Sequence, residues 1–281
     1  MPEVQKFSYH NHTNFSDGKN SLEEMVQRAK EIGFTEMGIS DHLIVHKNIC
    51  KSPSWAAMVA NNEADIYQTD FKTMLEKYQR HCEHIRKVAK AENIKLYVGF
   101  EVDFFTYDGW LDEFKDFLAQ IDYDYVISGN HFLFDPSCET IYNINKSIGE
   151  VLTLDQIRAL VAQHFNNIRE SANCGLFRFV AHLDYVRKMG ADYCKPQDFW
   201  AEKMAVLDAL ERHHTGIEVS TKGLRKINDF YPNGTILDEV AKRNIDVVIS
   251  DDAHKVGELG LDFERAEQEL RQRNVVHRLK F

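Results

Sequence analysis

FSYHNHTNFSDG, residues 7–18, is the stretch from which the fold can be predicted. A short apolar run leads directly into His10 and His12, and Asp17 follows five residues later. Side chains two residues apart on an extended strand point to the same side, so the two imidazoles share one face. That spacing suits bidentate binding of Zn²⁺, Mn²⁺ or Fe²⁺.

The same arrangement, an apolar run that ends on a potential metal ligand, recurs along the chain. MGIS leads into Asp41-His42, LYVGF into Glu101, YVISGN into His131, FRFVA into His182, and DVVIS into Asp251, Asp252 and His254. A parallel barrel directs all its strand ends to one face, where an active site forms. The recurrence therefore predicts a barrel with a metal pocket at the carboxyl ends of its strands.

Helical patterns separate these strands, which is typical of a parallel α/β sheet. We expect helices over 21–33, 70–92, 110–120, 153–173, 197–213, 234–243 and 262–273, and a short closing strand at 275–281. About seven strands with ligands at the same ends favour a barrel over an open sheet, which binds its ligand at one crevice. Residues 43–70 look irregular and predict a lid-like insertion over the strand ends.

Length and composition narrow the class of protein. A chain of 281 residues with 43% hydrophobic residues can form one barrel domain over 1–281. The net charge of −10 argues against nonspecific binding to nucleic acid. No apolar run is long enough to span a bilayer, and residues 1–12 lack the features of a signal peptide, so we expect a cytoplasmic protein. Five scattered cysteines without a CxxC motif predict reduced thiols.

A single histidine at a strand end is more often a hydrogen-bonded structural residue than a ligand, but the combination reverses that balance. His81, His84, His213 and His214 fall on predicted helices and are interpreted as solvated. The remaining candidates outnumber what one metal needs and predict two or three divalent transition metals, zinc, manganese or iron. They are His10, His12, Asp17, His42, Glu101, His131, His182, Asp252 and His254.

In this order, HNHTNFSDG, ISDH, GFEVDF, GNHF, AHLD and SDDAH resemble the motifs of the PHP (polymerase and histidinol phosphatase) superfamily. GFEVDFF, DYDYVISGNHFL, IYN and EVSTKGLRK are most similar to its histidinol-phosphate phosphatase branch. The resemblance implies a distorted (β/α)7 TIM-like barrel with a trinuclear metal centre. It departs from that branch at SGNH, at Ser220, where asparagine is expected, and at Asp251, where serine is common.

The resemblance also implies how the ligands are shared among three metals. One set is His10, His12, Glu101 and Asp252; the second is Glu101, His131 and His182; the third is Asp17, His42 and His254. Glu101 would bridge the first two metals. Together with Asp252 and His254, it would take part in catalysis.

The function that we expect is metal-dependent hydrolysis of a phosphate monoester, with L-histidinol phosphate, in histidine biosynthesis, as the expected substrate. Arg225 in KGLRK is the first candidate for a phosphate contact, with Arg187 and Tyr142 as further substrate contacts. Lys222 and Lys226 are weaker candidates. An acidic, aromatic mouth for the cationic end of the substrate is predicted at Asp103, Phe104, Phe105 and Tyr142.

Three other functions remain open at this stage. The first is another phosphoesterase of the same superfamily, a nuclease or a phosphotyrosine phosphatase, although the acidity of the chain disfavours action on nucleic acids. The second is a non-catalytic metal-binding domain, which would be expected to lose ligands. The third is a hydrolase of C–N bonds, a class that carries a strand-end lysine as its bridging ligand where this chain has Glu101.

Overall fold

The computed structural model describes residues 4–60, 65–144 and 146–281, and its central feature is a curved parallel sheet. Within these residues the strands of the main path follow the spatial order β1-β2-β5-β6-β9-β10-β11, and every neighbouring pair is parallel. Their bounds are Phe7–Ser8, Glu36–Ile39, Lys95–Val102, Tyr125–Ser128, Phe179–Val180, Gly216–Ser220 and Val247–Ser250.

The first and last strands of this path meet just beyond their ends, which closes the sheet into a barrel. A parallel bridge joins Asn11 to Ala253, and the amide of His12 donates a hydrogen bond of 2.9 Å to the Ala253 carbonyl. The Gln5 side chain also donates to the Ile249 carbonyl at 2.7 Å. The predicted seven-stranded barrel is therefore confirmed.

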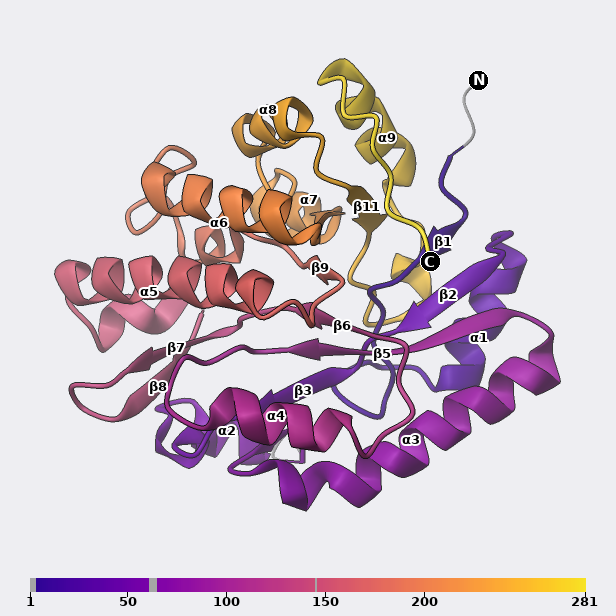
Figure 1. Ribbon diagram of the computed structural model, residues 1–281, viewed down its shortest axis with the longest axis horizontal. Helices are drawn as coiled ribbons and strands as arrows, with labels where there is room; N and C mark the ends of the chain where they lie inside the picture. Colours follow the sequence, from indigo (N-terminus) through magenta and orange to yellow (C-terminus); the bar gives the residue numbers. More distant parts are fainter. Residues whose placement is uncertain (1–3, 61–64, 145) are drawn as a thin grey trace.

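Helices cover the outside of the barrel (Figure 1). Helices α3 and α4 lie below the sheet in this view, α1 lies at its right-hand side, and α5, α6, α8 and α9 lie above it. Their bounds are Leu22–Glu31 for α1, Phe71–Glu92 for α3, Trp110–Leu118 for α4, Leu154–Asn173 for α5, Trp200–His213 for α6, Gly234–Arg243 for α8 and Phe263–Gln272 for α9. These helices agree with the predicted ranges to within three residues at either end.

Helix α3 shows why these segments fold as they do. Asp70 caps its first turn by accepting a hydrogen bond from the Thr73 amide at 2.9 Å. Buried side chains then recur at helical spacing, at Met74, Tyr78 and Ile85, and pack against the barrel. The helix ends at Asn93, which adopts the left-handed conformation typical of a helix C-terminus.

The end of the barrel away from the metal ligands is filled by Tyr125, which reaches across from β6. Its hydroxyl donates to the Tyr9 carbonyl at 2.5 Å. A Cβ on Gly99 would lie 2.2 Å from this ring, and one on Gly38 equally close to its hydroxyl. The absence of side chains on these two neighbouring strands therefore makes room for the tyrosine. The ring of Phe281 packs on Tyr9 at 4.3 Å between centroids and places the C-terminus beside β1 (Figure 1).

The segment 43–70 is more regular than we predicted. It contains β3 (His42–Val45), a 3-10 turn (Ile49–Lys51), α2 (Trp55–Ala60) and β4 (Tyr67–Gln68), while 61–64 fall outside the described residues. Strand β3 pairs with both β5 and β4, so the start and the end of the insertion are joined to the sheet. Its role as a lid stays a prediction.

Three further segments differ from expectation. Residues 275–281 form only one bridge, between Arg278 and Val247, instead of a strand. An antiparallel hairpin follows His131 and comprises β7 (Phe132–Asp135) and β8 (Thr140–Asn143). A short helix, α7 (Lys222–Ile227), follows β10. The remaining 3-10 turns are Lys146–Glu150, Tyr185–Met189 and Val256–Glu258.

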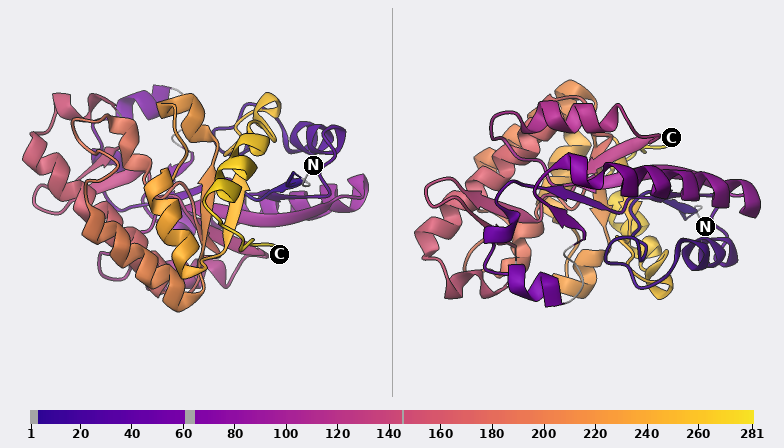
Figure 2. Two further views of the ribbon diagram at one scale, coloured as in Figure 1. Left: turned by 90° about the horizontal axis from the view of Figure 1, so that it is seen from above. Right: turned by 90° about the horizontal axis from the view of Figure 1, so that it is seen from below.

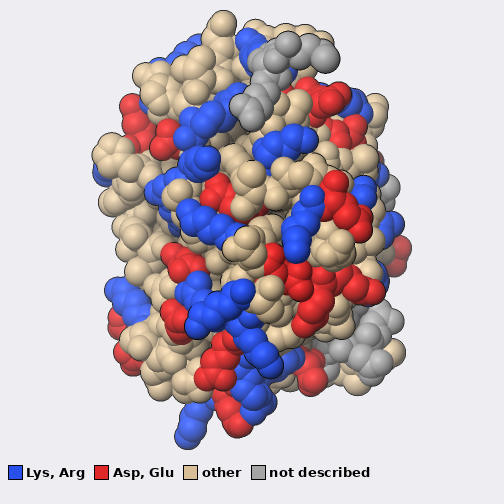
Figure 3. Space-filling view, turned by 90° about the vertical axis from the view of Figure 1, so that its right-hand side faces the viewer, with Lys and Arg blue, Asp and Glu red and all other residues tan. Residues whose placement is uncertain are grey.

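Both signs of charge occur on the face shown in Figure 3, where acidic side chains gather to the right of the centre and basic side chains gather below it. None of the described helices is both long and apolar enough to cross a membrane. All five cysteines are free, as predicted.

Candidate metal centre

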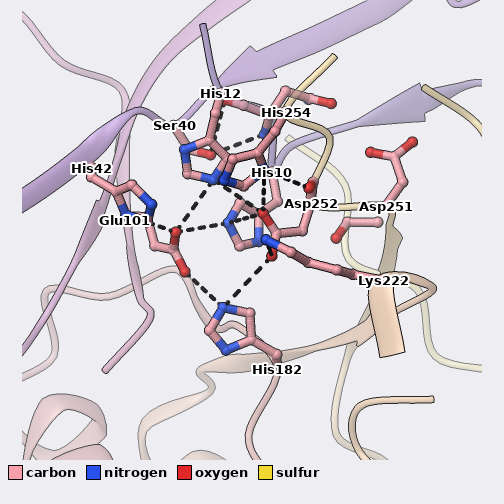
Figure 4. A network of polar contacts seen from close by, with 12 residues as sticks. His10, His12, Ser40, His42, Glu101, His182, Lys222, Asp251, Asp252 and His254 are labelled. Carbon is pink, nitrogen blue, oxygen red and sulfur yellow. Dashed lines mark hydrogen bonds and ion pairs between the residues drawn. The ribbon is translucent and has the colours of Figure 1, made fainter. Parts of the chain in front are cut away.

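All nine predicted ligands meet at the carboxyl ends of the barrel strands. Figure 4 shows His10, His12, His42, Glu101, His182, Asp252 and His254 among them. Strand β1 leads into His10 and His12, β5 carries Glu101, and β11 leads into Asp252. His42 opens β3, which continues the line of β2 after a break at Ser40-Asp41. Asp17 comes from the loop between β1 and α1. The parallel register brings together residues that are far apart in the sequence.

Glu101 lies at the middle of this cluster and is fully buried. Its Oε1 is 2.8 Å from His182 Nε2 and 3.3 Å from His131 Nε2. Its Oε2 faces three other rings at 3.1–3.3 Å, those of His10, His12 and His42. The two carboxylate oxygens thus face different groups of histidines, which is the arrangement of a carboxylate that bridges two metals.

Three overlapping groups of ligand atoms are each compact enough to hold one ion. The first consists of His10, His12, Glu101 and Asp252 and equals the set that the family resemblance implies. The second consists of His42, Glu101 and His131, with His182 also in contact with Glu101. The third consists of His12, Asp17, His42 and His254. His12 thus belongs to both the first and the third group, and His42 to both the second and the third, whereas the family resemblance assigns each of them to one metal.

The residues present fit divalent metals chemically. The imidazole nitrogens and carboxylate oxygens are ligand types that zinc, manganese and iron accept. Both ring nitrogens of His12, Nε2 of His10, Oε2 of Glu101 and Oδ1 of Asp252 are buried and make no hydrogen bond to the described residues. Buried polar atoms without hydrogen bonds are costly unless something else satisfies them. Metal ions would satisfy one nitrogen of each imidazole and both carboxylate oxygens.

The charges of the cluster favour the same conclusion. Burial opposes ionisation of Glu101 and Asp252, but neighbouring cationic groups, His10 for Glu101 and Lys222 for Asp252, outweigh it and hold both pKa values well below their usual range. Burial likewise opposes protonation of His12, yet the Asp252 and Glu101 carboxylates raise its pKa to about 9. The centre therefore attracts cations strongly.

Two more buried carboxylates orient the histidines from behind. Glu218 accepts a hydrogen bond from Nδ1 of His10 at 2.7 Å and one from the amide of His182 at 2.8 Å. Asp103 lies 2.8 Å from Nδ1 of His131 and also accepts from its amide at 2.6 Å. A carboxylate on the second ring nitrogen fixes the tautomer of a metal-binding histidine and raises its basicity. The Nε2 atoms of His10 and His131 therefore remain free to face Glu101.

Comparison with known proteins agrees with this geometry. The PHP domain model matches residues 8–222, about three quarters of the chain. The chain belongs to the PHP domain family. A probable histidinol-phosphatase from Deinococcus radiodurans is 26% identical over 256 residues, which are 88% of this chain and 85% of that protein. The histidinol-phosphatase of Bacillus subtilis is 23% identical over 273 residues, which are 93% and 98% of the two chains.

A solved PHP structure supports the fold. The histidinol phosphate phosphatase of Lactococcus lactis, crystallised with zinc, L-histidinol and phosphate, superposes with a TM-score of 0.72 at 17% identity. The match covers 99% of this chain and 97% of that one. The TIM-like barrel inferred from the sequence is therefore the fold of the PHP family.

Lys222 forms an ion pair with one of the predicted metal ligands, Asp252. Its Nζ is 2.7 Å from Oδ2 of Asp252, and Figure 4 shows it pointing into the cluster. The Oδ1 atom of the same carboxylate faces His12 at 3.2 Å. Lys222 thus occupies one oxygen of Asp252, and the other oxygen is available to the group formed with His10, His12 and Glu101. The sequence ranked Lys222 low, because nothing in KGLRK indicates which cation points inward.

A second cation, Lys188, lies beside the cluster of predicted ligands, on the 3-10 turn that follows His182. Its Nζ donates to the Tyr185 hydroxyl at 2.6 Å. The Tyr185 ring is buried between the imidazoles of His182 and His131, with centroids 4.6 and 5.2 Å away. Lys188 was not among the predicted residues.

The predicted substrate contacts lie in other surroundings. The Arg225 guanidinium donates to the backbone carbonyl of Asp251 at 2.9 Å. Arg187 is paired with Asp184 at 3.1 Å and also with Asp229, and it donates to a backbone carbonyl, so a structural role accounts for its guanidinium. The hydroxyl of Tyr142 is 3.7 Å from the sulfur of Cys138 within the β7–β8 hairpin.

One interpretation of the sequence is wrong, and another stays a prediction. Asp103, Phe104 and Phe105 are all buried, and Asp103 contacts His131, so their role at a substrate mouth stays a prediction. His81 is only 5% exposed and is paired with Asp41, although we interpreted it as solvated. His84 is exposed as expected, with a side chain that is 47% accessible.

Backbone strain marks the same face of the barrel. Asn130, His182 and Asp252 have positive φ angles of 54°, 25° and 48°. Residues other than glycine rarely adopt this conformation, and it persists at functional sites, where the surrounding structure enforces it. In each case the turn redirects a strand end toward the cluster, a feature that the sequence gives no sign of.

Proposed function

We propose that this PHP protein is a metal-dependent phosphomonoesterase and that its substrate is L-histidinol phosphate. The observation that carries the proposal is the juxtaposition of nine ligand-type side chains with two lysines at one end of the barrel. The similarity to histidinol-phosphatases along nearly the whole chain supports the choice of substrate.

His10, His12, His42, His131 and His182 would hold two or three divalent metals together with Glu101, Asp252, Asp17 and His254. When bound, such metals activate water and neutralise charge on a phosphoryl group. The protein residues hold the carboxylates ionised and the imidazoles oriented, so little rearrangement accompanies reaction. Glu101, with one oxygen toward each group of histidines, would set the spacing of the first two ions.

The phosphate would lie between the metals and the lysines. Lys222 and Lys188 carry ammonium groups on the side of the cluster formed by Asp252 and Tyr185. Phosphoryl transfer depends mainly on positioning and on charge stabilisation, and ammonium groups contribute to both. We therefore place the first phosphate contact at Lys222 instead of Arg225.

His254 would contribute as a ligand in the group that contains His12, Asp17 and His42. Burial, with Lys222 next in importance, lowers its pKa to about 4. The imidazole is then neutral near pH 7, which is the form that binds metals.

The test is a substrate panel on one metal-loaded preparation. We expect kcat/KM for L-histidinol phosphate to exceed that for p-nitrophenyl phosphate by orders of magnitude, because polar groups that recognise the amine and imidazole reject analogues that lack them. A phosphotyrosine peptide and a short single-stranded DNA complete the panel. Preferred cleavage of either would assign the protein to another phosphoesterase activity, and equal slow rates on both monoesters would reject histidinol phosphate as the substrate.

A further inference from the structure

Asp41, the neighbour of His42, is fully buried but does not face the metal ligands of the first group. Its two oxygens accept hydrogen bonds from the Thr13 amide and the Thr13 hydroxyl, both at 2.8 Å. The Ser16 hydroxyl donates to the same carboxylate at 2.5 Å. Asp41 therefore ties down residues 13–16, the loop that immediately precedes Asp17.

Helix α3 supplies the fourth partner of this carboxylate. Nε2 of His81 is 2.9 Å from Oδ2 of Asp41 and donates to it, since the ionised carboxylate can only accept. The His81 ring also stacks on Phe15, with centroids 3.7 Å apart and planes 5° from parallel. Lys77 places its ammonium over the Phe15 ring at 4.9 Å. The loop before Asp17 is thus held to α3 by both hydrogen bonding and stacking.

The same helix also contacts His42. The Tyr78 hydroxyl donates a hydrogen bond to the backbone carbonyl of His42. The Tyr78 ring packs edge-on against Phe15 at 5.0 Å. Tyr78 and His81 are three residues apart on α3 and so lie on one face of it. That single face touches the backbone of one predicted ligand and the loop that carries another.

Asp17 and His42 belong to the same group of ligand atoms, with His12 and His254. We call the ion that this group would hold the outer metal. The name reflects exposure: the side chains of Asp17 and His254 are 26% and 21% accessible, whereas those of His10, His12, Glu101 and Asp252 are almost fully buried. An outer ligand on a loop depends on the groups that hold the loop.

We propose that His81 and Tyr78 are positioning residues for the outer metal. His81 acts through Asp41 on the loop of Asp17, and Tyr78 acts on the backbone of His42. The inference rests on the proposed metal centre and deepens it, because it assigns control of one ion to a helix that contributes no ligand. Residues that support ligands in this way typically change metal affinity by roughly 10–100-fold when they are substituted.

The test measures metal binding directly, without reference to hydrolysis. His81→Leu and Tyr78→Phe are equilibrated with buffered Zn²⁺ or Mn²⁺, and the bound equivalents are counted by elemental analysis. We expect His81→Leu to weaken the most weakly held ion roughly 10–100-fold and to lose about one equivalent at limiting metal, with the others retained. Tyr78→Phe should weaken the same ion less.

Matched controls separate positioning from general damage. His81→Gln keeps a donor that can reach Asp41 and should restore most of the affinity. His84→Leu, one turn along the same helix, removes an exposed ion pair with Glu23 at 2.8 Å and should leave every ion in place. Helices α3 and α1 are neighbours (Figure 2, right), and the His84–Glu23 pair joins them.

If His81→Leu fails to fold, Ser16→Ala removes one bond to Asp41 from the loop side and should weaken the same ion. Unchanged affinity for all ions in a folded His81→Leu protein, or an equal loss of all of them, would overturn the positioning role. A parent protein that binds no metal would instead overturn the proposed function, so the two failures can be distinguished.

Discussion

Gly129 lies directly against the carboxylate of Glu101. A Cβ on Gly129 would be 2.4 Å from Oε1 and 2.7 Å from the carboxyl carbon, closer than real contacts allow. Because Glu101 is buried among five imidazoles, it has little room to move away. The glycine in SGNH is thus required by the position of the central carboxylate.

Gly129→Ala should therefore displace Glu101 and weaken metal binding by an order of magnitude or more. Overpacking of this kind also costs about 1–3 kcal/mol of stability. Gly257→Ala is the matched control, because a Cβ there meets nothing within 4 Å. Metal titration and thermal unfolding of both variants would check this, and full metal affinity in Gly129→Ala would show that Glu101 can adapt.

Glu101→Gln should lose metal and most of kcat while thermal unfolding stays cooperative. The substitution removes the anionic charge that both groups of histidines face but keeps the side-chain volume. The measurement is kcat at matched metal loading, with bound metal counted on the same sample. Near-normal turnover under those conditions would refute a bridging role.

Lys222→Met should raise KM for phosphate esters and weaken inhibition by inorganic phosphate, each roughly tenfold or more, as expected for loss of a charged hydrogen bond. Arg225→Ala should have a smaller effect, because its guanidinium is engaged with a backbone carbonyl. Metal counts on both variants exclude an indirect effect through Asp252. A larger effect of Arg225→Ala would return the phosphate contact to the residue that the sequence favoured.

Phosphate inhibition should also depend on pH through Lys188. Burial, followed by repulsion from Lys222 and Lys226, lowers the pKa of Lys188 to about 8. The charged ammonium that binds phosphate is present below that pH and is lost as the pH rises through it. Wild type and Lys188→Met share every other titrating group, so the ratio of their inhibition constants isolates this lysine.

That ratio should be largest near pH 7 and approach one above about pH 9. A ratio that stays constant across this range would mean that Lys188 does not contact phosphate.

The barrel and the gathering of the ligands could be predicted because both follow from one repeated local pattern. Each apolar run ends on its own ligand, and the parallel register does the rest, as for Glu101 and His182. The residues behind the ligands could not be predicted in this way. Glu218 contacts His10, and His81 contacts Asp41, only in the folded protein. Nothing in the sequence around Glu218 or His81 distinguishes them from solvent-exposed residues of the same type.

The directions in which side chains point could not be predicted from the sequence either. KGLRK contains three cations, and only the start of a short helix after β10 decides that Lys222 turns inward. Asp103 follows Glu101 by two residues and so resembled part of a pocket. The backbone instead directs it to the amides of His131 and Phe132.

The bridge between Asn11 and Ala253 has a consequence for the order of events during synthesis. His12 leaves the ribosome 240 residues before Asp252. At roughly 5–20 residues per second, the early imidazole waits for many seconds without the partners that complete its site. Under the proposed metal assignment, stable loading would follow the docking of β11 against β1. An ion held by His10, His12 and Asp252 would then link the two ends of the closed barrel.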